Sequence, residues 1–172
     1  MRRMFLTIGA LLLLGCAGLT EEIIEGVTGE EIEISEDGMS VTLPGGGRME
    51  MKFGESARHD PGLSLSPPPS ATPQMSAVIS LPDQPTTHLI TYHSDADLAA
   101  LVEQYRTELG AKGLEVQESA TSEGGTVLSA QDGELHYFVS VGPSEDGNDG
   151  VTVALGVGAS NAIEEGFSNS MQ

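Results

Sequence analysis

Histidines and carboxylates are the side chains of this chain best suited to bind a metal ion or to move a proton. His93, Asp95 and Asp97 alternate along a short stretch, and an imidazole with two carboxylates is a plausible ligand set for a divalent cation. The same two carboxylates also suit a helix N-terminus, where they face unpaired backbone N–H groups. We favour the second interpretation, and we predict no metal, no cofactor and no catalytic residue.

The other histidines, His59, His88 and His136, are widely spaced in the sequence. His88 and His136 fall in segments whose alternating hydrophobicity predicts strands, so they would meet only if the strand order brings them together. An enzyme would need His88, His93 or His136 to converge with carboxylates in one cleft. We therefore predict that the chain is not an enzyme.

Two glycine-rich loops resemble ligand-binding loops only in composition. Residues 144–150 are acidic, but they lack the glutamate that closes an EF-hand loop, and they join two predicted strands rather than two helices. Residues 45–47 are three glycines with no Lys-Ser/Thr pair and no helix after them, unlike a phosphate-binding loop. Both are interpreted as hairpin loops.

Cys16, the only cysteine, is the one nucleophile whose surroundings indicate a reaction. Arg2 and Arg3 precede an apolar run from Met4 to Leu14. That run is too short for a bilayer core of ~30 Å, which needs about 20 helical residues, and it fits the hydrophobic region of a secretion signal.

The residues before Cys16 resemble the lipobox of bacterial lipoproteins: a branched apolar Leu13, then Leu14, then a small Gly15. The resemblance implies that signal peptidase recognises Leu13, Leu14 and Gly15, that the Cys16 sulfur takes a diacylglyceryl group, and that the mature chain begins at Cys16. Two or more acyl chains anchor a protein stably in a membrane. The alternative is an ordinary secretion signal with an incidental cysteine.

The predicted location is therefore the bacterial cell envelope, with the polypeptide in water and the lipid in the membrane. Ala17 is not the aspartate that favours inner-membrane retention, so the outer membrane is favoured where two membranes exist.

The charge of the chain argues against binding to nucleic acid or to an anionic lipid surface. It has 172 residues with 7 Lys and Arg against 26 Asp and Glu, and nucleic-acid binding needs clustered basic residues. Removal of Arg2 and Arg3 leaves five basic residues against 26 acidic ones, a net charge of −21. Such a surface is repelled by anionic lipid, so the membrane contact has to be the covalent lipid on Cys16.

The composition divides the chain into five segments. These are a signal peptide (1–15), a short helix with a β-meander (16–53), a Pro/Ser/Gly-rich linker (54–74), a small α+β domain (75–158) and a disordered tail (159–172). Apolar residues alternate in three runs of the meander, as half-buried strands require. The linker composition is typical of an extended spacer.

The clearest helix of the chain begins after Ser94-Asp95-Ala96-Asp97, which matches a capping box with Ser94 as N-cap. Its apolar face is made of residues at helical spacing, namely Leu98, Leu101, Val102, Tyr105 and Leu109. Four strands are predicted after it, over 114–118, 126–131, 134–141 and 151–157, with Asp132-Gly133 as a hairpin turn.

The predicted fold class is α+β: an N-terminal β-meander, a Pro-rich linker, and a two-layer β-α-β-β-β-β unit with one helix on a mostly antiparallel sheet. The unit from His88 to Val157 resembles a small domain of uncharacterised secreted proteins and lipoproteins. The residues that carry this resemblance are Thr91-Tyr92, Ser94 to Asp97, Tyr105-Arg106, Leu109, Gly113-Leu114 and Asp132-Gly133. The resemblance supports the fold prediction and implies no activity.

A single helix covers only one face of a sheet, so the second face needs polar residues or a partner. Phe138 and His136 alternate with the inward set of their strand, which makes them candidates for an interface, either with the meander or with an envelope protein. The predicted role is structural or protein-interacting. The alternative is a ligand carrier with a pocket between helix and sheet, beside Tyr92, Tyr105 and Tyr137.

Overall fold

The computed structural model describes residues 32–43, 45–144 and 149–159. The described strands are β1 (Ile32–Ser35), β2 (Gly38–Leu43), β3 (Gly47–Phe53), β4 (Thr72–Ser80), β5 (Thr87–Ser94), β6 (Gln117–Ala120), β7 (Thr126–Asp132), β8 (Leu135–Pro143) and β9 (Val151–Ala159). One α-helix, α1 (Leu98–Ala111), and two short 3₁₀ helices, η3 (Gly54–Ser56) and η4 (Pro61–Leu63), complete the described elements. None of these described helices is long and apolar enough to cross a bilayer.

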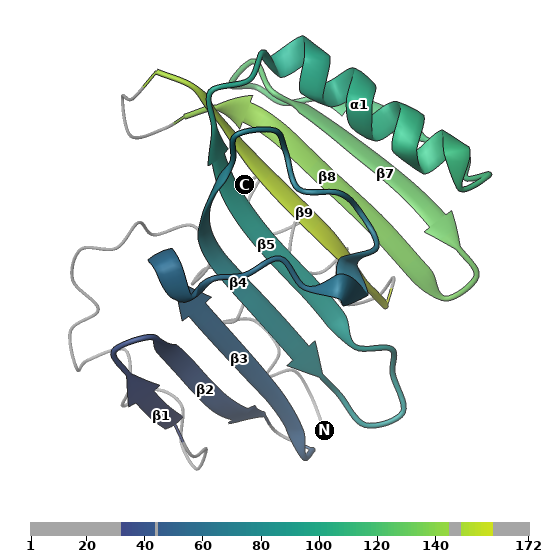
Figure 1. Cartoon of the computed structure of the whole chain (residues 1–172). Helices are drawn as coiled ribbons and strands as arrows, with labels where there is room; N and C mark the ends of the chain where they lie inside the picture. The colour runs from purple at the N-terminus through teal and green to yellow at the C-terminus, as the bar shows by residue number, and fades with distance from the viewer. Residues whose placement is uncertain (1–31, 44, 145–148, 160–172) are drawn as a thin grey trace.

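All nine described strands belong to one antiparallel sheet with the order β1-β2-β3-β4-β5-β9-β8-β7-β6. The first five strands follow chain order, and the chain then crosses to the far edge through α1 and returns as β6 to β9 (Figure 1). β9 therefore lies beside β5, with Ile90 directly opposite Leu155.

The predicted fold class is wrong, because the meander and the second unit are parts of the same sheet. The joint is β4, which pairs with β3 through Met49 and Ile79 and with β5 through Ala77 and Leu89. Pro73 and the Pro-rich stretch before it had predicted a spacer, whereas β4 tolerates Pro73 at a bulge near its first residues. The described part of the chain is a mostly antiparallel β structure with one α-helix, and in it no linker separates the meander from the second unit.

We call the side of the sheet that α1 covers the helix face. α1 lies across β7 and β8, and residues 54–71, which we call the strap, run across β4, β5 and β9 on the same side (Figure 1). Leu63 and Leu65 of the strap are 0% and 2% exposed, so this Pro-rich segment completes the core rather than spacing two units. The core cluster consists mainly of residues from these elements, including Ile90, Tyr92, Leu101, Val102, Tyr105, Leu109, Leu128, Tyr137, Val139, Val153 and Leu155.

The apolar face of α1 is as predicted, with Leu101, Val102, Tyr105 and Leu109 buried. The predicted cap is wrong by one turn, because Asp97 is the N-cap and its carboxylate accepts a hydrogen bond from Ala100 N at 3.0 Å. Ser94 is fully buried, and its hydroxyl accepts from Ala96 N and donates to the carbonyl of Pro69 in the strap. A side chain predicted to start the helix therefore fixes the strap instead.

Candidate functional site

The strap brings His59 and Asp60 to β5, which carries His88. Alternation along β5 places His88, Ile90 and Tyr92 on the helix face, and the strap lays His59 and Asp60 over them. His59 Nδ1 and the Tyr92 hydroxyl form a hydrogen bond of 2.7 Å. The Tyr92 side chain is 1% exposed, so this bond satisfies a polar atom that burial would otherwise leave unpaired.

The second contact joins Asp60 to His88. Oδ1 of Asp60 lies 3.2 Å from Nδ1 of His88, an ion-pair distance when the ring is protonated, although the alignment does not make a hydrogen bond. Gly62 lies directly on the His88 ring, and a Cβ at this position would overlap the ring atoms. Only glycine therefore lets the strap approach β5 this closely.

The strap is also bonded to the helix. Tyr105 donates from its hydroxyl to the carbonyl of Ser66 at 3.0 Å, and the Glu108 carboxylate accepts from the backbone N of Ser66 at 2.7 Å. Burial, with smaller contributions from Glu108 and Tyr92, raises the pKa of the Tyr105 hydroxyl above its ordinary value.

These hydrogen bonds and this ion pair attach the strap to the sheet and to the helix. The polar atoms are used to hold the strap on β5 and α1. Among the described residues no three His, Cys, Asp or Glu side chains are close enough together to hold a metal ion.

Alkaline pH should destabilise the attachment of the strap to β5. Burial raises the pKa of Tyr92 from 10 to about 12. Because the folded state holds the tyrosine proton more tightly than the unfolded state, the stabilisation is fully present below pH 10 and is lost as the pH rises toward 12. Urea unfolding across that range should show a falling free energy of unfolding. The variant Tyr92→Phe should show a shallower fall, and an unchanged slope in this variant would contradict the assignment.

The remaining predicted site residues are scattered. His93 Nε2 lies 3.7 Å from Asp95, and Asp97 caps the helix, so the three side chains weighed as a ligand set have two separate roles. His88 and His136 lie on opposite faces, because His88 is opposite Val157, and Val157 is opposite Tyr137, the neighbour of His136.

Phe138 and His136 lie on the face away from α1, which we call the back face. Phe138 is 6% exposed and is paired with Ser129 and Gly156. The buried Nδ1 of His136 has no hydrogen-bond partner among the described residues.

Several predictions fall outside the described residues. Leu13, Leu14, Gly15 and Cys16 precede residue 32, as does the short helix that was predicted before the meander. Most of the acidic loop, at 145–148, and the predicted tail after residue 159 also lie outside them.

The space proposed for a carrier pocket is filled by side chains. Tyr92, Tyr105 and Tyr137 are 1%, 0% and 6% exposed and belong to the packed core. Two hollows among the described residues lie elsewhere, one of about 260 Å³ over β1 to β3 and one of about 400 Å³ beside residues 54–58 and 72–74.

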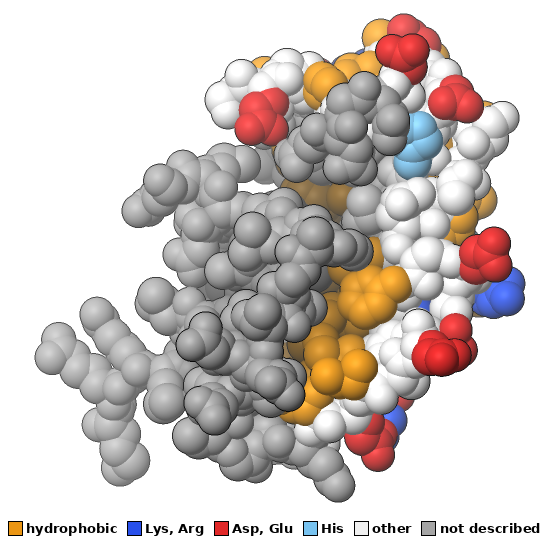
Figure 2. Space-filling model, turned by 90° about the vertical axis from the view of Figure 1, so that its left-hand side faces the viewer, with side chains coloured by type: hydrophobic (Ala, Val, Ile, Leu, Met, Phe, Trp, Pro, Cys, Tyr) orange, Lys and Arg blue, Asp and Glu red, His pale blue; other side chains and the backbone are white. Residues whose placement is uncertain are grey.

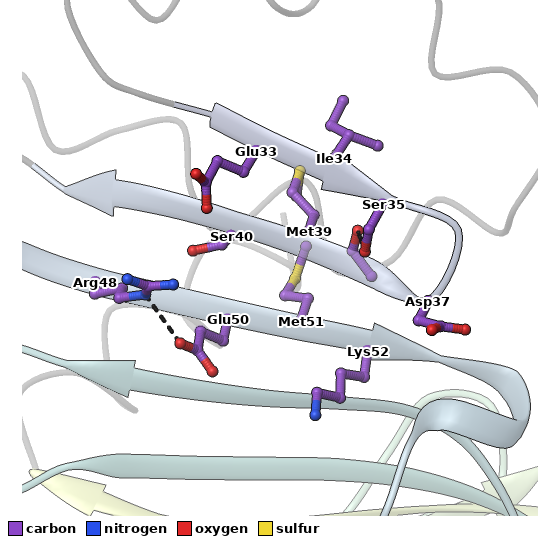
Figure 3. A pocket seen from close by; sticks show the side chains of 11 residues that line it. Glu33, Ile34, Ser35, Asp37, Met39, Ser40, Arg48, Glu50, Met51 and Lys52 are labelled. Carbon is purple, nitrogen blue, oxygen red and sulfur yellow. Dashed lines mark hydrogen bonds and ion pairs between the residues drawn. The ribbon is translucent and has the colours of Figure 1, made fainter.

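The back face of β1 to β5 carries a second set of apolar residues, separate from the core cluster under α1. Cross-strand pairing places one apolar set on it, consisting of Ile32, Ile34, Met39, Val41, Leu43, Met49, Met51, Phe53, Met75, Ala77, Ile79 and Leu89. The hollow over β1 to β3 opens beside this set, and Figure 3 shows Met39 and Met51 next to one another on neighbouring strands. Hydrophobic side chains reach the surface on the side of the molecule where β1 lies (Figure 2).

The apolar side of the sheet therefore changes along the strand order. On β7 to β9 the apolar residues point to α1, whereas on β1 to β4 they point away from it. No described helix lies on the back face of β1 to β3, because α1 contacts β7 and β8, η3 contacts β4, and η4 contacts β5 and β9.

The alternation of the meander was predictable from the sequence, but the extent of its apolar face was not, because that extent depends on the pairing of β4 with β3. The pairing of His59 with Tyr92, which lie 33 residues apart, was not predicted either. The signal that was available was Leu63 and Leu65 in the strap, two apolar residues at alternate positions that a solvated spacer would not need.

Comparison with known proteins gives one similarity. Residues 72–150 match a family model described as START domain-like. The match begins at β4 and ends just before β9, so it includes α1 and leaves out β1 to β3 and the whole strap. It agrees in coarse terms with the resemblance of His88–Val157 to a small uncharacterised domain. None of the curated proteins and none of the solved structures compared with the chain matches it.

Proposed function

We propose that this protein is a lipid-anchored component of the bacterial cell envelope that binds another protein through the back face of β1 to β4. The observation that carries the interaction is the apolar set on that face. Ile34 is exposed, and Met39 and Met49 beside it are partly exposed. Apolar side chains gathered at a surface commonly mark a binding site. The lipobox-like residues ending at Cys16 support the anchor.

Replacing Cys16 with serine tests the anchor. The hydroxyl is a far weaker nucleophile than the thiol, so the variant takes no diacylglyceryl group, and we expect it to leave the membrane fraction almost completely. The wild-type chain should float with membranes and incorporate labelled palmitate. A Cys16→Ser chain that remains acylated and membrane-bound would contradict the proposal.

A photo-crosslinking amino acid on β3 tests the interaction. Met49 lies on the back face, whereas its neighbour Arg48 is exposed on the opposite face, so the two positions form a matched pair. We expect a discrete crosslinked species in intact cells from position 49 and none from position 48. Equal crosslinking at both positions, or none at 49, would contradict a partner on this face.

A further inference from the structure

β1 is an open edge of the sheet. It pairs with β2 on one side, and no described strand pairs with its other side. The unpaired N–H and C=O groups of an edge strand can accept another chain as an additional strand. β6 forms the other edge, so the molecule allows a direct comparison between two edges.

The two edges differ in their side chains. Ile34 on β1 is 68% exposed, and it is the large hydrophobic residue that the described part of the chain leaves exposed. β6 consists of Gln117–Ala120, all exposed, and its Glu118 forms an ion pair with Arg106 of α1. β1 therefore has the character of a binding edge, and β6 that of a solvated one.

The charges around β1 indicate what kind of chain could pair with its open edge. Glu33 is opposite Ser40 on β2 and has no ion-pair partner among the described residues, while Arg48 and Glu50 are paired with each other at 2.9 Å. Glu36 and Asp37, both exposed, follow directly in the turn. A second copy of this chain fits poorly, because an antiparallel copy centred on Glu33 would place two carboxylates together and each chain has a net charge of −19.

We propose that β1 accepts an extended segment of a partner protein as a further antiparallel strand, and that this segment alternates basic and apolar residues. The proposal rests on the interaction role given above and specifies the chemistry of the partner. The basic side chains would lie on the side of Glu33. The apolar ones would lie beside Ile32 and Ile34 on the back face, continuous with Met39 and Met51 (Figure 3).

A peptide of alternating lysine and valine, about eight residues long to match a typical strand, is the probe. Its binding to the purified full-length chain is measured by fluorescence anisotropy at low and high salt. We expect saturable binding that weakens with salt, because part of it is charge attraction at an exposed surface. Glu33→Gln should lower this salt dependence.

Ile34→Lys and Ser119→Lys form a matched pair. Both positions are exposed on the back face of an edge strand, and both substitutions change the net charge by the same amount. We expect Ile34→Lys to weaken binding about tenfold, through loss of an apolar contact and addition of a like charge, and Ser119→Lys to leave it nearly unchanged. A peptide with proline at alternate positions should bind much more weakly, because proline removes backbone donors.

Three results would overturn the proposal: no peptide binding to the wild-type chain, equal loss in Ile34→Lys and Ser119→Lys, or undiminished binding of the proline peptide. A wild-type dimer that Ile34→Lys dissociates would also overturn it, in favour of a second copy on this edge. Failure here is distinct from failure of the interaction role, because crosslinking from Met49 does not require a free edge on β1.

Discussion

Tyr105→Ala is expected to lower the free energy of unfolding by about 4 kcal/mol, as for other aromatic residues removed from a core. The Tyr105 side chain is fully buried in the core cluster, and its hydroxyl donates to the Ser66 carbonyl, so one residue joins α1 to both the sheet and the strap. Urea unfolding followed by circular dichroism gives the free energy. Backbone hydrogen exchange around Leu63 and Leu65 should rise in the same variant, because the strap loses one of its attachments.

Tyr105→Phe separates the two contributions. It keeps the ring in the core and removes only the hydrogen bond to Ser66, so we expect a cost of about 1 kcal/mol. If Tyr105→Phe were as damaging as Tyr105→Ala, the hydroxyl rather than ring packing would dominate. If Tyr105→Ala cost less than the phenylalanine variant is expected to, the packed helix–sheet core described here would be wrong.

Gly38→Ala is expected to destabilise the protein by about 2 kcal/mol, within the range for steric overpacking. Gly38 begins β2 directly after the turn, and a Cβ there would overlap the backbone carbonyl oxygen of Met51 on β3. The backbone cannot yield as a flexible side chain can, so the hairpin of β1 and β2 has to shift away from β3. Chemical unfolding, together with hydrogen exchange of β2 and β3, measures the effect.

Gly110→Ala is the matched control, because the same methyl group is added where nothing lies within 4 Å. Gly110 is exposed near the end of α1, and alanine is the better helix former, so we expect a gain of about 0.5 kcal/mol. The two substitutions should therefore change the free energy of unfolding in opposite directions. A loss of stability in both would show that the Gly38 result does not depend on the contact with Met51.

Features that depend only on residues close together in the sequence could be predicted. The helical spacing of Leu101, Val102, Tyr105 and Leu109 predicted α1, because the buried stripe of a helix follows from its own 3.6-residue period. Turn positions were less exact. Asp132-Gly133 was predicted as a turn, whereas the pair Asp132–Leu135 places the turn one residue later.

The candidate surfaces depended on distant pairings and were only partly predictable. Phe138 and His136 were correctly placed on the face away from the helix by alternation alone. The apolar set on β1 to β4 was missed as one surface, because its extent depends on β4 pairing with β3. The exposure of Ile34 likewise depends on β1 being an edge, which the strand order decides.

By itself the sequence determined the charge of the protein, the short apolar run just before its single cysteine, the alternating runs of the strands and the buried stripe of the helix. These are properties of composition and of short segments, so no long-range contact is needed to recognise them. Only the tertiary structure decided that the meander continues through β4 into the second half, that the strap belongs to the core, and that the apolar side of the sheet changes between its two halves. The reason is physical: a strand presents hydrogen-bonding groups on both edges and side chains on both faces, and only its neighbours select which of them are buried.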